Sequence, residues 1–117
     1  MANEGLFGIH GTALAVRSQR MGQLASNIAN ASTPGYQAKD IDFQAALRGA
    51  EAPGGRTDMA IGAATKYRVP TQASIDGNTV ELSTEQTAFA ENAVAYQTTL
   101  SFLNGRINTI TRALKGE

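Results

Sequence analysis

The sequence contains no cysteine and a single histidine, and its charges cancel, with ten basic and ten acidic residues. The absence of cysteine excludes disulfides, thiolate metal sites and cysteine nucleophiles, and it is compatible with either the cytoplasm or the periplasm. Because neither sign of charge is in excess, the long-range field that attracts nucleic acid or anionic lipid is missing. We therefore expect neither a nucleic-acid-binding protein nor a membrane-surface protein.

Long apolar runs are also lacking. No window approaches a transmembrane helix, and Gly8, His10 and Gly11 interrupt the apolar residues near the amino terminus, so we predict no cleaved signal peptide. The eight leucines, seven isoleucines, four valines and four phenylalanines are few beside 20 alanines, close to the lower limit for a packed core. Residues 1–117 therefore fit one domain whose isolated monomer we predict to be marginally stable.

Groups capable of catalysis are sparse. His10 has only Glu4 as a nearby acid, which favours a structural or exposed role for this histidine. Asp40 and Asp42 would point to different sides of a helix, and capping of a helix by Asp40 is the better interpretation. We predict no enzyme, no catalytic or metal site, no cofactor and no small-molecule substrate. A cell-wall hydrolase stays a rival hypothesis that lacks an acid–base pair.

The sequence does contain two long segments with helical heptad spacing. Residues 5–31 and 84–115 are predicted helices, and the second would begin with a capping box formed by Ser83 and Gln86. His10 and Arg17 interrupt the first apolar stripe, so it must contact something that accommodates polar side chains. We define the seam as the apolar stripe residues of both helices, which are our predicted assembly interface: Phe7, Leu14, Met21, Leu24, Ile28, Phe89, Tyr96, Leu100, Leu103, Ile107, Ile110 and Leu114.

Shorter elements are predicted between these helices. Pro34-Gly35 suits a type II turn, residues 40–48 a short amphipathic helix, and residues 50–72 a flexible loop. Asp76-Gly77 could form the turn of a small β-hairpin. The expected fold class is mainly α, with the terminal helices packed as an elongated, coiled-coil-like pair.

The stripes have two interpretations. They could be the private core of an antiparallel helical hairpin, or they could contact other subunits. Val94 and Phe102 lie off the seam, and a stripe wider than one partner can cover indicates more than one neighbour. We therefore favour an assembly subunit.

The segment from Leu24 to Tyr36, Leu-Ala-Ser-Asn-Ile-Ala-Asn-Ala-Ser-Thr-Pro-Gly-Tyr, resembles the amino-terminal signature of the flagellar rod and hook family. Its motif residues are Asn27, Asn30, Thr33, Pro34, Gly35 and Tyr36. Asn27 and Asn30 are expected to offer their side-chain amides to backbone groups at the helix end. Four further segments resemble proximal-rod members of the family, and the similarity covers more than half of the chain: 37–43, 77–82, 88–97 and 100–107.

The resemblance implies a structural component of the proximal rod of a bacterial flagellar basal body. Such a subunit would polymerise through its terminal helices, transmit torque and line the export channel. Its implied partners are copies of itself, other rod proteins, the membrane-ring adaptor at the rod base and the flagellar export apparatus. The implied location is the periplasmic rod, reached from the cytoplasm without signal cleavage. The alternative is a helical adaptor or export-associated protein that does not polymerise.

Overall fold

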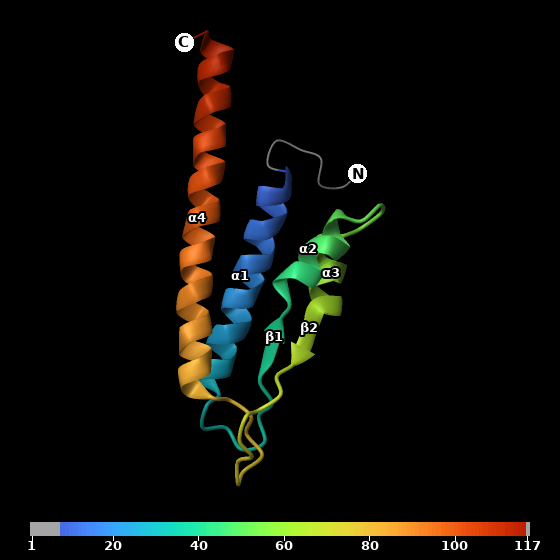
Figure 1. The fold of residues 1–117 in the computed structure, drawn as a ribbon, viewed down its shortest axis with the longest axis vertical. Coiled ribbons are helices and arrows are strands. Elements are labelled where there is room, and N and C mark those ends of the chain that lie inside the picture. Colours follow the sequence, from blue (N-terminus) through green and yellow to red (C-terminus); the bar gives the residue numbers. More distant parts are fainter. Residues whose placement is uncertain (1–7, 117) are drawn as a thin grey trace.

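The structure, a computed structural model, describes residues 8–116. The molecule is elongated, measuring 64 × 29 × 18 Å, and is mainly helical. Helices α1 (Gly8–Ala29) and α4 (Leu82–Lys115) run antiparallel side by side, and α1 lies between α4 and an arm that contains the other elements (Figure 1). This arrangement confirms the predicted fold class. No helix within residues 8–116 has the length and apolar character needed to cross a membrane.

The boundaries of the two long helices differ slightly from those predicted. Helix α1 ends two residues before the predicted end at residue 31, and residues 5–7 of the prediction lie outside the described residues. Helix α4 begins two residues earlier than predicted, and the capping box at Ser83 is wrong, because the N-cap residue is Glu81 and no side chain caps the helix. The carboxylate of Glu81 instead accepts hydrogen bonds from Thr71.

The first half of the arm is strand β1 (Lys39–Ile41) followed by helix α2 (Phe43–Glu51). The helix predicted over 40–48 is therefore displaced, and the prediction that Asp40 caps it is wrong. Asp42 is the cap, and its carboxylate accepts a hydrogen bond of 3.1 Å from the backbone N–H of Ala45. The physical reason is that Ile41 is buried in the core, which keeps the chain extended until it has passed residue 41.

The second half of the arm is helix α3 (Thr57–Ala64) and strand β2 (Thr65–Tyr67), so the flexible loop predicted over 50–72 is wrong there. Small residues allow α2 and α3 to approach closely, and a Cβ atom added at Gly49 would lie 3.1 Å from the Cβ of Ala60. A Cβ at Gly55 would lie 2.3 Å from the carbonyl oxygen of Gly49. The glycines and alanines that suggested a loop therefore serve close helix packing.

The small sheet is also formed by residues other than those predicted. Strands β1 and β2 pair antiparallel, with Asp40 opposite Lys66, whereas residues 74–81 form no strand, so the hairpin predicted at Asp76-Gly77 is wrong. A turn does occur there, with a positive φ of 76° at Gly77. The predicted type II turn is confirmed, since Gly35 has a φ of 74° and Tyr36 N–H donates to the Thr33 carbonyl at 3.2 Å.

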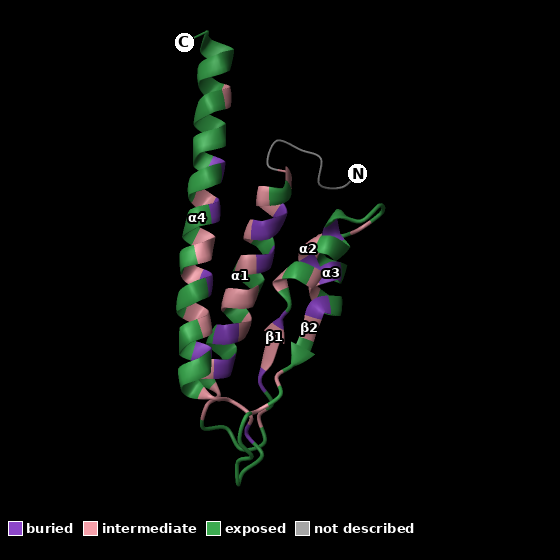
Figure 2. Ribbon diagram, viewed as in Figure 1, coloured by how far each residue is buried: buried purple, intermediate pink, exposed green. Residues whose placement is uncertain are grey.

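Burial is greatest around α1 and decreases along α4. A core cluster of Val16, Ile41, Ala46 and Ala64 fills the space between α1 and the arm. The buried residues of α1 and α4 lie mainly where the two helices run together, and the C-terminal part of α4 is almost wholly exposed (Figure 2). We call residues 104–115 of α4 the overhang, because they extend past the described start of α1.

Candidate assembly interface

The seam residues of α1 are less buried than other residues of the same helix. Leu24 is buried, Leu14, Met21 and Ile28 are half-buried, and Phe7 lies outside the described residues. The other buried positions of α1 are off the seam: Thr12, Ala13, Val16 and Asn27. Because α1 has α4 on one side and the arm on the other, its most buried face is set by two neighbours, which the stripe alone could not indicate.

On α4 the buried line is largely polar. Leu103 is the one buried seam residue there, Phe89, Tyr96, Leu100 and Ile110 are half-buried, and Ile107 and Leu114 are exposed. The other buried residues are Glu85, Asn92 and Thr99, which follow one another at intervals of seven. This heptad spacing of polar residues is visible in the sequence, but the apolar spacing alone was used to predict the buried side of α4.

Polar residues of α1 and α4 have specific partners on the neighbouring helices. Asn92 donates its Nδ2 to the backbone carbonyl of Arg17 at 2.8 Å. The rings of His10 and Phe102 stack with centroids 5.8 Å apart, and the Arg17 guanidinium lies 4.0 Å from the centre of the Phe43 ring. The polar interruptions at His10 and Arg17 are thus accommodated by aromatic residues, as the sequence required.

Asn27, the buried motif residue, connects three parts of the chain. Its Nδ2 donates to the carbonyl of Lys39 at 2.7 Å and to Oε2 of Glu85 at 2.8 Å, while its Oδ1 accepts from the hydroxyl of Tyr36 at 3.2 Å. A buried amide with its donors and acceptor in use fixes the geometry around it. Asn27 therefore joins the end of α1 to β1 and to the first turns of α4.

The rest of the motif closes the end of α1. Asn30 donates its Nδ2 to the Ser26 carbonyl at 2.8 Å and accepts from the Thr33 hydroxyl at 3.0 Å. Asn78, which the sequence did not single out, places its Nδ2 within 3.1 Å of the carbonyls of Asn30, Ala31 and Thr33. These contacts hold the backbone of the turn that follows α1, and the bond from Asn30 to the Ser26 carbonyl agrees with the backbone role expected for Asn30.

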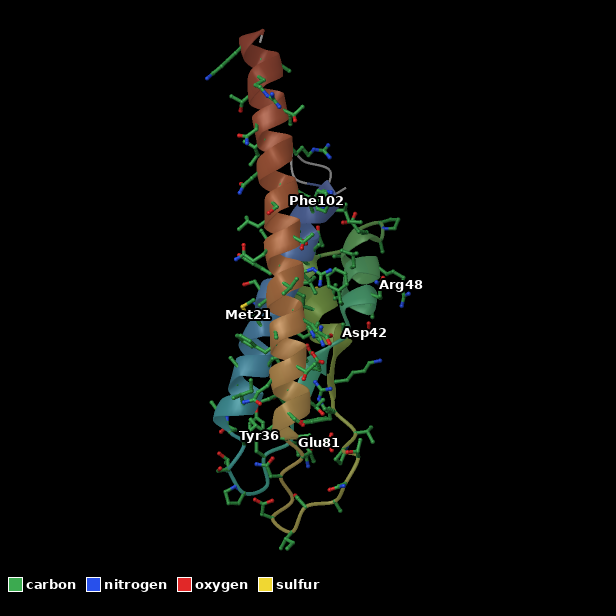
Figure 3. All side chains as sticks on the ribbon, turned by 60° about the vertical axis from the view of Figure 1, so that its left-hand side comes forward. Met21, Tyr36, Asp42, Arg48, Glu81 and Phe102 are labelled. Atoms are coloured by element: carbon green, nitrogen blue, oxygen red, sulfur yellow. The ribbon has the colours of Figure 1, made fainter. Side chains whose placement is uncertain are left out.

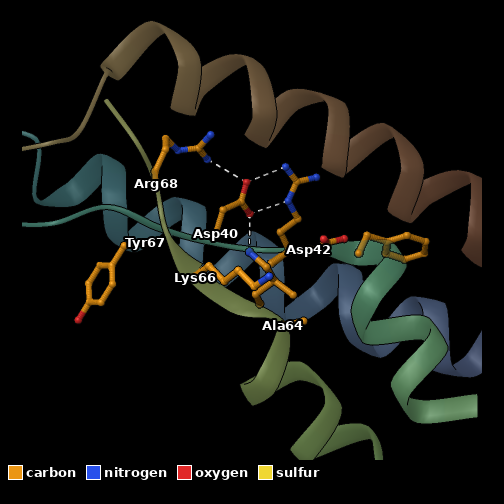
Figure 4. Close-up of a pocket in the computed structure, with 9 residues that line it drawn as sticks. Asp40, Asp42, Ala64, Lys66, Tyr67 and Arg68 are labelled. Carbon is orange, nitrogen blue, oxygen red and sulfur yellow. Dashed lines mark hydrogen bonds and ion pairs between the residues drawn. The ribbon is translucent and has the colours of Figure 1, made fainter. Parts of the chain in front are cut away.

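An ion-pair network ties the arm to both long helices. Figure 4 shows its centre, where Arg20 and Arg68 meet the carboxylate of Asp40. Arg20 binds Asp40 through two hydrogen bonds of 2.8 and 2.9 Å, and Arg68 donates to the same carboxylate at 2.9 Å. Arg68 Nε also lies 2.7 Å from Oε1 of Glu85, at an angle that makes this contact an ion pair rather than a hydrogen bond. The four charged side chains come from α1, β1, the residue after β2, and α4.

The charges in this network are stabilised by one another. Burial alone would raise the pKa of Asp40, but hydrogen bonds and positive charge from Arg20, with the charge of Arg68, hold that pKa below its usual range. The hydrogen bond with Asp40 raises the pKa of Arg20. Within residues 8–116, no three His, Asp or Glu side chains are placed to hold a metal ion. Because the network joins β1 and the residue after β2 to α1 and α4, it holds the arm in position. No local signal in the sequence indicates it.

An exposed apolar surface remains along α4, from the middle of the helix to its C-terminal end. The exposed fractions are 68% at Val94, 61% at Phe102, 36% at Ile107 and 83% at Leu114. Phe102 lies near the level at which α4 begins to stand clear of the rest of the molecule (Figure 3). This surface and the half-buried seam residues are the available candidates for contact with other chains.

The elongated helix pair, the Asn-rich turn and the exposed apolar surface define a structural subunit. The family described as "Flagella basal body rod protein" matches residues 7–37, which include all of α1 and the motif turn. A flagellar basal body rod protein FlgB of Cereibacter sphaeroides is 48% identical over 120 residues, covering 94% of each chain. FlgB of Aeromonas hydrophila is 44% identical, covering 95% of this chain and 93% of its own, and FlgB of Escherichia coli K12 is 40% identical, covering 88% of each.

The chain belongs to the FlgB family of flagellar basal body rod proteins. It is a component of the basal body rod, in a family of structural proteins.

Proposed function

We propose that this chain polymerises in the proximal rod through its terminal helices, where it transmits torque and lines the export channel. Its proposed partners are copies of itself, other rod subunits, the membrane-ring adaptor at the rod base and the export apparatus that delivers it. Family membership supports this proposal, and so does the geometry of α4. A contact repeated between unlike surfaces of successive subunits produces an open helical array, as a rod requires.

The observation that carries the proposal is the exposed apolar surface that extends from the middle of α4 to its C-terminal end. Val94, Phe102, Ile107 and Leu114 are at least one-third exposed, and most of them lie beyond or at the end of the contact with α1. A monomeric helix ordinarily places polar residues on a side that faces water. Apolar residues in these positions favour burial against another subunit.

Two seam residues are buried within the chain, so they are not available for contact with another subunit. Leu24 and Leu103 are buried within the chain, so a substitution there would damage the fold itself. The seam residues proposed for intersubunit contact are therefore those that remain accessible, above all Ile107, Ile110 and Leu114. Half-buried Met21 and Ile28 could be covered further by a neighbour.

The test is Leu114→Asp in the full chain, with Asn108→Asp as the matched control. Both substitutions place a new carboxylate on the exposed overhang, but only the first removes an apolar side chain. We expect Leu114→Asp to abolish rod assembly and motility while export continues, and Asn108→Asp to leave both intact. Motile cells with normal basal bodies in the Leu114→Asp strain would contradict the proposal.

The second candidate function is a helical adaptor or export-associated protein that does not polymerise. The contact between α1 and α4, which buries the seam residues Leu24 and Leu103 within the chain, favours it, because a helix pair that packs on itself needs no second subunit. Purified basal bodies separate the two candidates. An adaptor would be found with the export apparatus and be absent from isolated rods, whereas a rod subunit would be retained in them.

A further inference from the structure

A groove lies between the first half of α1, helix α2 and the middle of α4, and none of the seam residues within 8–116 lines it. Its volume is about 380 Å³, and its lining includes the apolar side chains of Ile9, Ala13, Leu47 and Phe102. Ile9 and Phe102 are each more than half exposed. The groove is therefore an open apolar surface separate from the overhang.

One charged side chain in the lining has no counter-ion. Arg17 forms no ion pair within residues 8–116, and its buried Nε has no hydrogen-bond partner there. Its neighbour Arg20 is bound by Asp40. Burial, and then the charge of Arg20, lower the pKa of Arg17, and no acidic residue of the described part of the chain lines the groove. A partly desolvated cation with a like charge beside it is a position where an incoming carboxylate would be strongly favoured.

We infer that this groove binds an amphipathic helix from another flagellar protein, and that an acidic residue of that helix pairs with Arg17. The inference rests on the proposed function and adds a second contact to it. Apolar side chains of the incoming helix would pack on Ile9, Leu47 and Phe102, the common mode by which a helix occupies an apolar groove. The carboxylate would give the contact its specificity, because with a neutral or basic helix Arg17 keeps its contact with the Phe43 ring but gains no counter-ion.

Charge argues that the occupant is a different protein rather than a second copy of this chain. The free helical segment of a second copy is its overhang, which carries Arg106, Arg112 and Lys115. No acidic residue occurs from residue 92 to residue 116, so the overhang would bring positive charge to Arg17. Like charges brought together in a contact oppose association.

The first arm of the test is site-specific photo-crosslinking in cells that express the full chain. A photoreactive phenylalanine analogue replaces Thr98, an exposed residue that lines the groove, and in a matched control it replaces exposed Met59 on α3. Basal bodies are purified and the crosslinked peptides are mapped. We expect the Thr98 position to capture a helical segment of another flagellar protein with Asp or Glu within one turn, and the Met59 position not to capture that segment.

The second arm is a charge exchange. Arg17→Glu should abolish motility, and changing the mapped acidic residue of the partner to Arg should restore it. Restoration separates loss of the ion pair from misfolding, because a misfolded chain is not rescued by a change in its partner. Arg17→Met retains the aliphatic packing but removes the charge, and it should weaken motility less than Arg17→Glu.

Four outcomes would overturn the inference. They are crosslinks to residues 1–7 of the same chain, crosslinks to a second copy, a captured segment without an acidic residue, and failure of the charge exchange in a chain that still folds. Absence of the chain from purified basal bodies would instead contradict the proposed function. The two failures are therefore distinguishable in the same preparation.

Discussion

The two ends of the helix pair are built in opposite ways. Where α4 begins, Glu85 is fully buried and is held by Asn27 and Arg68, so polar groups lie inside and are paired. Where α4 ends, Leu114 is 83% exposed, so apolar groups lie outside. Paired polar groups at one end fix how the helices and the arm meet, because a buried charge tolerates few alternative positions. The exposed apolar end is the part available to other subunits.

The largest loss of stability is expected when the buried acid Glu85 is removed. Glu85→Ala would leave Arg68 and Asn27 without their partner in a buried site, and we expect it to lower the free energy of unfolding by about 3–5 kcal/mol. Urea unfolding followed by circular dichroism measures the effect. Glu91→Ala, an exposed change on the same helix, should stay within about 0.5 kcal/mol. Equal effects of the two variants would contradict the structural role of Glu85.

A second substitution tests the apolar contacts at the same end. Leu24 is buried, and Leu24→Ala should cost about 2–5 kcal/mol through lost burial and a residual cavity. Met21→Ala, at a half-buried position one turn away, should cost clearly less. Denaturant midpoints of the two variants give the comparison. A larger loss at Met21 would contradict the observed burial, in which Leu24 is the buried seam residue of α1.

The arm can be tested through its glycines. Gly55→Ala would place a Cβ atom 2.3 Å from the Gly49 carbonyl oxygen, and we expect the required shift to destabilise the chain by about 1–3 kcal/mol. Gly62→Ala lies inside α3 with no atom within 4 Å of the new Cβ, and it should stabilise by up to about 1 kcal/mol. Thermal unfolding of both variants provides the measurement. A flexible loop in this region would tolerate both changes equally.

The ion-pair network predicts a dependence of stability on pH. Because the pKa of Asp40 is lower in the folded chain than its unfolded value of about 3.9, its contribution to stability is present above that value. The contribution is lost as the pH falls through the folded pKa. Asp40→Asn should therefore be less sensitive than the unmodified chain to a fall from pH 7 to pH 3, measured by urea unfolding. Asp42→Asn, at the exposed cap, should retain the sensitivity of the unmodified chain.

The smallest effect on stability is expected at the exposed end. Leu114→Asp, the variant proposed for blocking assembly, should change the free energy of unfolding of the isolated chain by no more than about 0.5 kcal/mol. Chemical unfolding of the purified monomer checks this. A decrease in the free energy of unfolding above about 1 kcal/mol would mean that the overhang stabilises the isolated chain. The contrast between the two ends of the helix pair would then disappear.

Much of the helical architecture was predictable because it depends on local signals. Apolar spacing located α1 and α4 to within a few residues, and Pro34-Gly35 gave the turn, since these features act over one or two turns of chain. The arm was not predictable in this way. Its helix α3 contains no wide apolar stripe, and it is held by the close approach of Ala60 to Gly49.

The candidate interface was predictable only in part. The accessible residues Ile107 and Leu114 follow directly from the apolar spacing, but the same spacing includes Leu24 and Leu103, which the chain buries itself. The positions of Arg17, Asp40 and Arg68 could not be deduced, because their contacts join segments far apart in the sequence. The residues next to a charged side chain in the sequence do not indicate which distant charged side chain will contact it in the folded chain.

The sequence by itself determined the two long helices, the turn between α1 and the arm, and the family to which the chain belongs, because each depends on nearby residues or on a contiguous motif. Only the tertiary structure decided which residues of each apolar stripe are buried within the chain, which side chains bind the buried acid Glu85, and which cation of the groove has no counter-ion within residues 8–116. The physical reason is that burial and charge pairing depend on which distant segments share the same space.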